Sequence, residues 1–265
     1  MKFGIIAGSG SLPIILTQQV KKIGRQVLVI SITKDADESL KELASEFYQI
    51  GIGQIKKVIN TLIEADAKEI AIIGKVSKNA LFNPLRFDTK AIKILSKLKN
   101  KSDSSIFSAI ADEIESSGIK LVDQRLYLGN LLPEKGFLTS HRLSKIQLSD
   151  IEYGMNLAKK SAELGIGQTV IVKDGMVIAV EAIEGTDEAI RRAGSLCNGG
   201  AIVAKSARQD HDFRFDVPTV GPKTIDVLIE AKASVLAIEY QKAFLIEPEL
   251  TIQKANNAKI AIFVI

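Results

Sequence analysis

The chain has 265 residues, 46% of them hydrophobic, which suits a globular protein with two ordinary cores. Its 35 Lys and Arg residues against 31 Asp and Glu give a formal charge of +4, too small for a protein that mainly coats nucleic acid, so we expect no nucleic-acid partner. Cys197 is the single cysteine, and the sequence shows neither a leader-like segment nor an apolar run of bilayer length. We therefore expect a cytoplasmic protein whose contact with a membrane is at most peripheral.

The first half of the chain predicts parallel βαβ units. Strands are expected over Lys2–Ala7, Arg25–Ile32, Glu69–Ile73 and Ile119–Val122, and helices over Leu12–Ile23, Ile55–Ala65, Thr89–Leu98 and Ser104–Ser117. Strands that alternate with helices of this length favour a parallel sheet. The first half therefore predicts a Rossmann-like domain.

The second half predicts a mixed α/β domain. Helices are expected over Ser149–Leu164, from Thr186, over Lys223–Ala231 and over Glu249–Ala255, and strands over Gln168–Lys173, Met176–Ala182, Ala201–Ala204, Val235–Glu239 and Lys259–Val264. The Asp174-Gly175 step between two β-rich runs predicts a tight hairpin. The fold class is thus α/β, with two domains over 1–128 and 129–265 that meet at a boundary over about 124–148.

Two turns in the first half are candidate ligand loops. Gly8, Ser9, Gly10, Ser11 and Leu12 follow the first strand and open a helix, a place where backbone N–H groups can bind phosphate. Gly74, Lys75 and Val76 follow a later strand at the same expected sheet edge. The plain alternative is a tight turn that needs glycine only for its backbone angles. Neither loop has the spacing of a dinucleotide fingerprint or of a Walker loop.

An acidic turn near residue 185 precedes a helix that carries basic residues. Glu184, Gly185, Thr186 and Asp187 are candidate substrate-binding or catalytic residues, and Arg191 lies one helical turn after Asp187. The alternative is structural, with Thr186 as the helix N-cap and Asp187 stabilising the helix dipole. Both roles can coexist at one helix end.

A proline corner supplies the strongest candidate for a catalytic carboxylate. Asp216 precedes Val217-Pro218, so its backbone is restricted, and Thr219 helps to shape the turn. Lys205 and Arg214 surround it in the sequence with positive charge. A carboxylate in this setting suits a Mg²⁺ ligand or a residue that orients water, and the cations suit developing phosphate charge. The alternative is an ordinary turn aspartate.

A basic amphipathic helix is predicted around residue 95. Lys90, Lys93, Lys97 and Lys101 recur at helical spacing beside isoleucine and leucine. Such a helix either contacts an anionic membrane surface or presents a solvated face over a core stripe. The second meaning is the commoner one.

Five motifs, taken in order along the chain, resemble the LpxI family, UDP-2,3-diacylglucosamine pyrophosphatases of lipid A biosynthesis. They are Gly4-Ile5-Ile6-Ala7-Gly8-Ser9-Gly10-Ser11-Leu12-Pro13, Gly74-Lys75-Val76-Ser77, Ile166-Gly167-Gln168, Ala179-Val180-Glu181-Ala182-Ile183-Glu184-Gly185-Thr186-Asp187 and Arg214-Phe215-Asp216-Val217-Pro218-Thr219-Val220-Gly221. The chain departs from the family pattern at Arg208-Gln209-Asp210-His211 and at Lys78-Asn79.

The resemblance implies Mg²⁺-dependent hydrolysis of the substrate's pyrophosphate to UMP and 2,3-diacylglucosamine 1-phosphate, with water attacking the sugar-side phosphorus. It also implies that the ligand is held between a ligand-binding domain over 1–128 and a catalytic domain over 129–265, with a hinge over about 124–148, and that any peripheral membrane contact is with the inner membrane. Asp216 matches the essential aspartate of the family, and Mg²⁺ is the implied cofactor. The departures leave a non-catalytic nucleotide-sugar binding protein as the alternative, and an NAD-linked enzyme as a weaker one. The sequence leaves the oligomeric state open, with a homodimer as one option.

Overall fold

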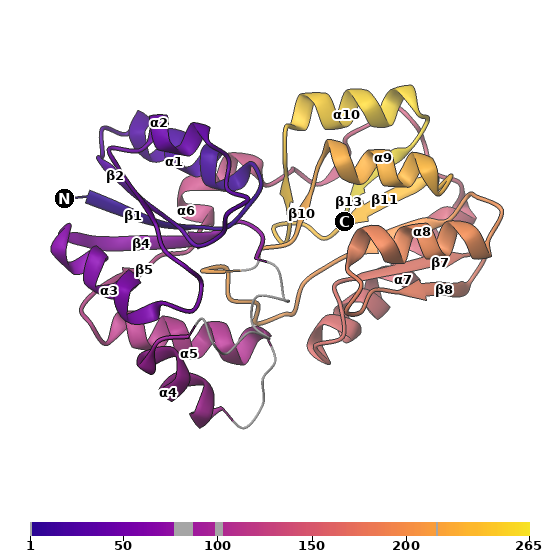
Figure 1. Ribbon diagram of the computed structural model, residues 1–265. Helices are drawn as coiled ribbons and strands as arrows, with labels where there is room; N and C mark the ends of the chain where they lie inside the picture. Colours follow the sequence, from indigo (N-terminus) through magenta and orange to yellow (C-terminus); the bar gives the residue numbers. More distant parts are fainter. Residues whose placement is uncertain (1, 77–86, 99–102, 216) are drawn as a thin grey trace. The chain divides into compact units, whose positions relative to one another are not determined.

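The computed structural model describes residues 2–76, 87–98, 103–215 and 217–265, which belong to two compact units (Figure 1). The first unit comprises Met1–Gly129 together with Asp212–Asp216, and the second comprises Asn130–His211 and Val217–Ile265. Each unit has its own sheet and its own cluster of buried apolar residues. Each therefore has the parts of an independent domain.

The N-terminal unit is built on a parallel sheet, as the sequence predicts. Its strands are β1 (Lys2–Ala7), β2 (Val27–Ser31), β3 (Glu46–Gln49), β4 (Ala67–Ile73) and β5 (Lys120–Leu121), in the order β3-β2-β1-β4-β5. Every neighbouring pair is parallel. The strand order reverses between β1 and β4, and that is where open α/β sheets collect ligands.

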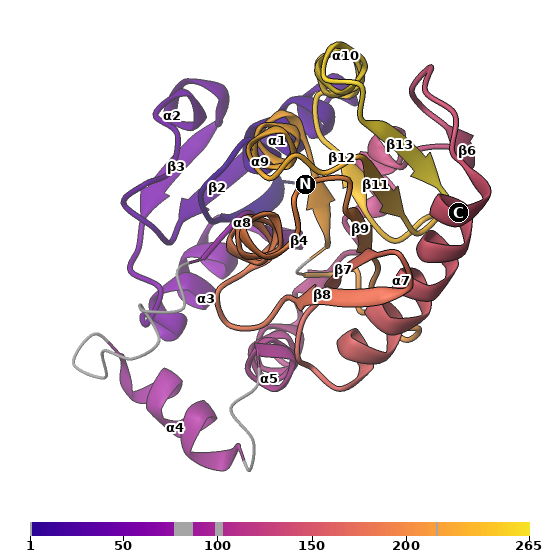
Figure 2. The ribbon, with the colours of Figure 1, turned by 90° about the vertical axis from the view of Figure 1, so that its right-hand side faces the viewer.

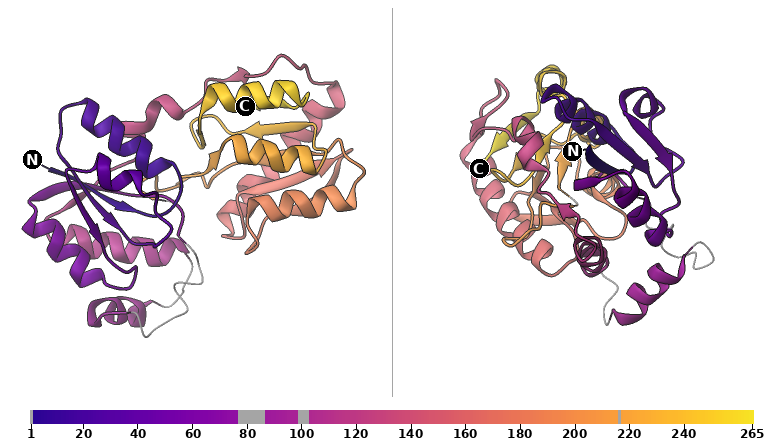
Figure 3. Two further views of the ribbon diagram at one scale, coloured as in Figure 1. Left: turned by 45° about the horizontal axis from the view of Figure 1, so that its top comes forward. Right: turned by 90° about the vertical axis from the view of Figure 1, so that its left-hand side faces the viewer.

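Helices cover both faces of this sheet, which explains why β2 is buried along its whole length (Figures 1 and 3). One face carries α1 (Leu12–Lys22), α2 (Ser39–Leu43) and α6 (Arg125–Leu128), which a short 3₁₀ helix over Gly129–Leu131 follows. The other face carries α3 (Ile55–Glu64), α4 (Thr89–Lys97) and α5 (Asp103–Glu115). The layered arrangement leaves the ends of the strands as the place for a ligand.

The C-terminal unit is built on a mixed sheet, also as predicted. Its strands are β6 (Gly136–Phe137), β7 (Thr169–Lys173), β8 (Met176–Val180), β9 (Ile202–Lys205), β11 (Val235–Ile238) and β13 (Ala261–Val264), in the order β6-β13-β11-β9-β7-β8. The three central strands β9, β11 and β13 are parallel. The outer strands β6, β7 and β8 run antiparallel to their neighbours.

Helices α7 to α10 enclose this sheet from its two sides (Figure 2). The long helix α7 (Lys145–Glu163) packs on one face, against β7 and β9. The other face carries α8 (Thr186–Leu196), α9 (Pro222–Glu230) and α10 (Pro248–Asn257). A small parallel pair, β10 (Thr219–Val220) and β12 (Phe244–Leu245), completes the unit. No helix in these described ranges is both long and apolar enough to cross a bilayer.

The predicted hairpin between β7 and β8 is confirmed. Lys173 pairs with Met176, and Asp174 and Gly175 both have positive φ, 50° and 75°. The carboxylate of Asp150 on α7 accepts the N–H groups of Asp174 and Gly175, each at 2.8 Å. This carboxylate therefore holds the turn against α7 and satisfies two of its backbone donors.

Some elements differ from the sequence prediction for identifiable reasons. The prediction omits β3, which lies at a sheet edge with two exposed residues and so lacks a continuous apolar run. It also begins α7 four residues late. Ser144 caps α7 through a capping box with Gln147, a signature that the apolar periodicity does not reveal.

The largest difference concerns the chain between residues 211 and 216. The prediction assigns all of 129–265 to the C-terminal domain, but Asp212–Asp216 belong to the N-terminal unit. We call the described part, Asp212–Phe215, the returning segment. Its Phe213 carbonyl accepts the N–H of Gln124 at 3.0 Å, and the Phe215 ring stacks on Phe107 at a centroid distance of 5.4 Å.

The expected hinge over about 124–148 also differs. Gln124 is only 2% exposed, and its side chain donates to the Ile72 carbonyl at 2.7 Å within the N-terminal sheet. Further along, β6 joins the C-terminal sheet, and Leu138 donates to the carbonyl of Ile262. Most of the expected hinge is thus integrated into one unit or the other.

Candidate functional site

The two candidate ligand loops of the first half lie side by side. The N–H of Ser9 donates to the Lys75 carbonyl at 2.9 Å, and the N–H of Lys75 donates back to the Ser9 carbonyl at 2.8 Å. The N–H of Gly8 donates to the Ile73 carbonyl at 2.8 Å. These bonds join the ends of β1 and β4, so both loops occupy the point where the strand order reverses.

Glycine is needed at Gly8 and Gly74 because the two turns approach so closely. A Cβ atom at Gly8 would lie 2.5 Å from the Lys75 carbonyl oxygen, and one at Gly74 would lie 2.9 Å from the Pro13 side chain. Gly74 also has a φ of 101°, where side chains are strained. The structural explanation of these glycines therefore holds, and it does not exclude a ligand.

Gly8→Ala is expected to lower the free energy of unfolding by about 1–3 kcal/mol, because the added methyl group must displace the backbone of the Lys75 turn. Urea unfolding measures this change. Gly129→Ala is the matched control, since that glycine is in the same unit, has a φ of −58° and has open space where its Cβ would lie. Equal stability of the two variants would contradict the tight packing of the turns.

The beginning of α1 can accept an anion. Within the described residues, the N–H groups of Gly10, Ser11 and Leu12 have no acceptor, and Ser11 does not cap the helix with its side chain. Lys75 is exposed beside this turn, and the predicted loop ends at the half-buried Val76. Unpaired N–H groups at a helix start together with an ammonium group suit a phosphate.

A buried lysine occupies the corresponding sheet edge of the C-terminal unit. Lys205 ends β9 and is 5% exposed. Its ammonium donates to the hydroxyl of Thr186 at 2.8 Å and to that of Thr169 at 3.3 Å. The Thr186 hydroxyl in turn donates to a carboxylate oxygen of Glu181 at 2.9 Å. The structure thus brings together two predicted residues, Lys205 and Thr186, and adds Glu181 and Thr169.

The start of α8 differs from the alternative that made Thr186 the N-cap. Gly185 is the N-cap, with a φ of 84°, and Thr186 is the first helical residue. Asp187 lies in the first turn, where a carboxylate stabilises the helix dipole. In the described part of the chain, no acceptor is bound to the N–H groups of Thr186 and Asp187. This helix start therefore also suits an anion.

Arg191 points to carboxylates of its own unit instead of to the Lys205 cluster. It donates to Glu188 at 2.6 Å and to Glu230 at 2.9 Å. The hydrogen bond to Glu230 is the main cause that raises the pKa of Arg191. Arg191 does not pair with Asp187. Its bond to Glu188 stays within α8, and its bond to Glu230 joins α8 to the end of α9.

Glu184 is likewise held by a neighbouring arginine. Arg192 binds its carboxylate at 2.6 Å and the Val180 carbonyl at 2.9 Å, which fixes the connection between β8 and α8. The hydrogen bond from Arg192 lowers the pKa of the Glu184 carboxyl group. Thr219, the last predicted binding residue, pairs with Phe244 between β10 and β12.

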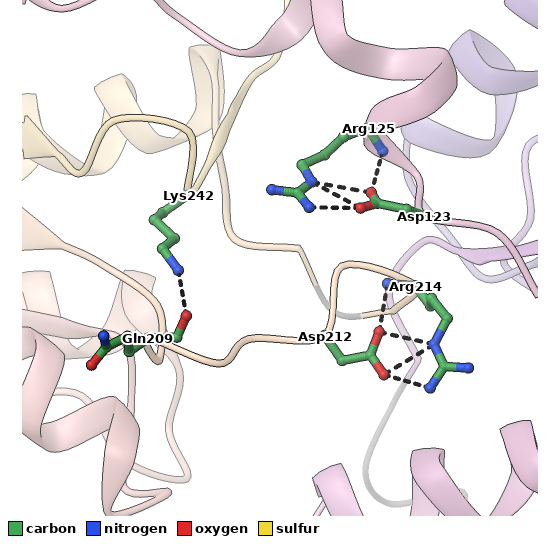
Figure 4. A network of polar contacts seen from close by, with 6 residues as sticks. All are labelled: Asp123, Arg125, Gln209, Asp212, Arg214 and Lys242. Carbon is green, nitrogen blue, oxygen red and sulfur yellow. Dashed lines mark hydrogen bonds and ion pairs between the residues drawn. The ribbon is translucent and has the colours of Figure 1, made fainter.

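Arg214 is part of the returning segment, and its guanidinium group binds two carboxylates. It binds Asp212 through two nitrogens, the shorter contact being 2.7 Å (Figure 4), and it binds Glu115 on α5 at 3.0 Å. The bond to Asp212 is the largest cause that raises the pKa of the guanidinium group. Figure 4 also shows the Asp123–Arg125 pair of the same unit.

The segment before the returning segment is tied to its own unit. Lys242 donates to the main-chain carbonyl of Gln209 at 3.0 Å (Figure 4) and to that of Arg208, also at 3.0 Å. These contacts fall where the chain departs from the family pattern. Asp216, Lys78 and Lys101 lie outside the described residues, so their predicted roles stay predictions, as does the placement of the ligand between the two domains.

The basic helix α4 presents a solvated face over a buried apolar stripe, the commoner of its two predicted arrangements. Its apolar stripe, Ala91 and Ile94, is buried in the core of the N-terminal unit, and Lys90 pairs with Glu113 on α5. That ion pair lowers the pKa of the Glu113 carboxyl group. The buried stripe cannot enter a membrane while the helix stays packed, and surface contact through the lysines stays a prediction.

Comparison with known proteins gives the family. The model of the LpxI N-terminal domain matches residues 2–131, and the model of the LpxI C-terminal domain matches residues 134–263. The chain belongs to the LpxI family. A member from Caulobacter vibrioides, named UDP-2,3-diacylglucosamine pyrophosphatase LpxI, is 28% identical over 267 residues, covering 97% of this chain and 94% of that one.

The similar solved structures include two enzymes whose likeness to this chain is weak. The biotin carboxylase subunit of pyruvate carboxylase matches 64% of this chain with 14% identity and a TM-score of 0.27. N5-carboxyaminoimidazole ribonucleotide synthetase from Thermotoga maritima matches 69% with 16% identity and a TM-score of 0.26. The chain spans 34% and 41% of their lengths. Likeness at this level carries no argument about function.

Sequence reasoning did not place Glu181 in the site. It directly follows β8 and precedes the acidic turn by three residues, so it looks like the first residue of a loop. Thr169 was also missed because it begins a strand. The pairing of β7 with β9 sets Thr169 opposite Lys205, and the pairing of β7 with β8 brings Glu181 beside Thr169. Both signals appear only in the folded sheet.

Proposed function

We propose that the chain catalyses the Mg²⁺-dependent hydrolysis of the pyrophosphate bond of UDP-2,3-diacylglucosamine, giving UMP and 2,3-diacylglucosamine 1-phosphate. The observation that carries this proposal is the match of both LpxI domain models, in order, along nearly the whole chain. The Caulobacter relative with the corresponding name adds support over nearly the full length of both chains.

The polar groups described above suit a diphosphate substrate. Each unit has a helix start whose first N–H groups bind no acceptor among the described residues, with a lysine nearby, Lys75 at α1 and Lys205 at α8. Helix N-termini and ammonium groups are favourable partners for phosphate oxygens. We assign these groups to holding the phosphates and, for Lys205, to stabilising the negative charge that develops during hydrolysis.

Arg191 and Arg214 were expected to stabilise phosphate charge, and we now assign them a structural role. Arg191 and Arg214 each bind two carboxylates, so their charge is largely compensated before any substrate arrives. Such pairs favour positioning of the chain over direct contact with phosphate. Arg191 then joins α8 to α9, and Arg214 holds the returning segment that directly precedes Asp216.

A Mg²⁺ ion that is held mainly by the substrate phosphates would need few ligands from the protein. Among the described residues no three His, Cys, Asp or Glu side chains gather as a metal site, but Mg²⁺ is commonly held by one or two carboxylates together with substrate phosphates. We propose Asp216 as that carboxylate. When bound, the ion would neutralise diphosphate charge and polarise a P–O bond. Asp216 would also orient the attacking water.

An assay of UMP release, with EDTA and after Mg²⁺ is restored, tests this proposal. Release should stop in EDTA and return with Mg²⁺. Release that persists in EDTA would contradict the metal requirement. Tight binding of the UDP-sugar without release under any metal condition would contradict catalysis and select the alternative, a binding protein.

A further inference from the structure

A carboxylate behind the Lys205 cluster has no role in the reaction as described so far. Glu181 accepts the Thr186 hydroxyl at 2.9 Å through one oxygen and the N–H of Gln168 at 3.3 Å through the other. Its own N–H donates to the Thr169 carbonyl at 2.9 Å. Glu181 is therefore held in one orientation by backbone and side chain together.

The donors and acceptors of this cluster fix the direction of its hydrogen bonds. An ammonium group can only donate, so the hydroxyl of Thr186 must be an acceptor in its 2.8 Å bond with Lys205. The Thr186 hydroxyl lies 2.9 Å from Glu181, whose carboxylate can only accept, and 3.4 Å from the Thr169 hydroxyl, which can itself donate. The single hydroxyl proton of Thr186 is therefore assigned to the shorter bond, to Glu181. Carboxylate, hydroxyl and ammonium thus form one ordered chain of three groups.

We infer that Glu181 is a positioning residue for hydrolysis, which orients the Thr186 hydroxyl and through it places the Lys205 ammonium at the start of α8. This inference rests on the proposed function of Lys205. Without the carboxylate the Thr186 hydroxyl can rotate, and the ammonium loses a fixed acceptor. Small displacements of a charge-stabilising group are costly in rate, about 10²-fold for an error near 1 Å.

The backbone around Glu181 is secured independently of its carboxylate. A Cβ atom at Gly167 would lie 2.1 Å from the Glu181 carbonyl oxygen, so the two chains are in close contact there. Arg192 holds the neighbouring Val180 carbonyl, and the N–H of Ser206 donates to the Gln168 carbonyl at 2.9 Å. Glu181→Gln leaves one acceptor oxygen for two donors, the Gln168 N–H and the Thr186 hydroxyl. If that oxygen keeps the Gln168 N–H, the amide nitrogen faces the Thr186 hydroxyl as a donor and removes its acceptor, while the fold should stay in place.

Steady-state UMP release by Glu181→Gln, together with thermal unfolding, tests the inference. We expect kcat to fall about 10²-fold with little change in KM and in the unfolding temperature. Thr186→Val should reproduce this loss, Thr186→Ser should restore most of the activity, and the Glu181→Gln/Thr186→Val double variant should lose little more than either single one. Glu163→Gln, an exposed residue at the end of α7, is the control.

The outcomes separate this inference from the proposed function. If the unaltered protein releases no UMP, the proposed function fails. If it releases UMP and Glu181→Gln does so at the same kcat, only the inference about Glu181 is overturned. If Glu181→Gln fails to fold, Thr186→Val decides: an unchanged kcat in that variant overturns the inference, and a selective loss of kcat supports it.

Discussion

Asp216→Asn is expected to reduce Mg²⁺-dependent UMP release by about 10³-fold or more while the protein stays folded. Asparagine keeps the size of the side chain but removes the negative charge that would hold Mg²⁺ and orient water. The change should appear in kcat, because the lost interaction belongs to the reacting groups more than to substrate binding. Steady-state assays over a range of Mg²⁺ concentrations, with circular dichroism as the test of folding, measure it.

Asp210→Asn is the matched control for this variant. Asp210 lies six residues earlier in the same charged stretch, and its side chain is 86% exposed. Its carboxylate oxygen is 3.8 Å from the Nε atom of Arg208, which is a long ion pair. Its replacement should leave the rate within about twofold, as expected for surface changes. Full activity in Asp216→Asn would contradict the proposal that Asp216 binds Mg²⁺ and orients water. The family membership would still hold, because it rests on the two domain matches.

Lys205→Met is expected to give the second largest loss, about 10²–10³-fold in kcat/KM, because it removes the buried ammonium group assigned to phosphate charge. Methionine is flexible and of similar length, so it can fill the space at the end of β9. Lys205→Arg should recover only part of the activity, since the planar guanidinium group cannot place a point charge between Thr186 and Thr169. UMP release and thermal unfolding measure both effects.

Lys254→Met provides the comparison for a lysine of the same unit. Lys254 forms a surface ion pair with Asp226 at 2.6 Å, and such pairs contribute about 0–1 kcal/mol to stability. This control should keep its activity. A Lys205→Met protein that is folded and equally active would show that the buried ammonium serves only the fold.

Much of the fold was predictable because it depends on local patterns. The apolar runs of β1, β2 and β4 and the helices between them indicate a parallel sheet, and the structure confirms it. The Asp174-Gly175 turn was equally clear. The returning segment could not be foreseen, because a short charged stretch carries no signal of the unit on which it packs. Its anchor, Gln124, is a polar residue whose burial depends on tertiary contacts.

The site was predictable where topology dictates it. Gly8 and Gly74 follow parallel neighbours, so their turns had to meet at one sheet edge, and they do. Charge density suggested Lys205, and the acidic turn before a helix suggested Thr186, but their contact depends on how the strands and α8 pack in the folded unit. The same reasoning was less useful for Arg191, because charge density cannot tell whether the partner of a guanidinium group is a ligand or a carboxylate such as Glu230.

The returning segment prevents the two units from being separated by a single cut in the gene. The chain enters the first unit twice, so one cut at the gene level cannot yield two intact fragments. A fragment that starts at Asn130 would carry Phe213 and Phe215, 7% and 6% exposed in the whole chain, without the surface that covers them. Such a fragment would expose aromatic surface to aggregation. An exchange of domains between members of this family therefore has to move residues 1–129 and residues 212–216 together.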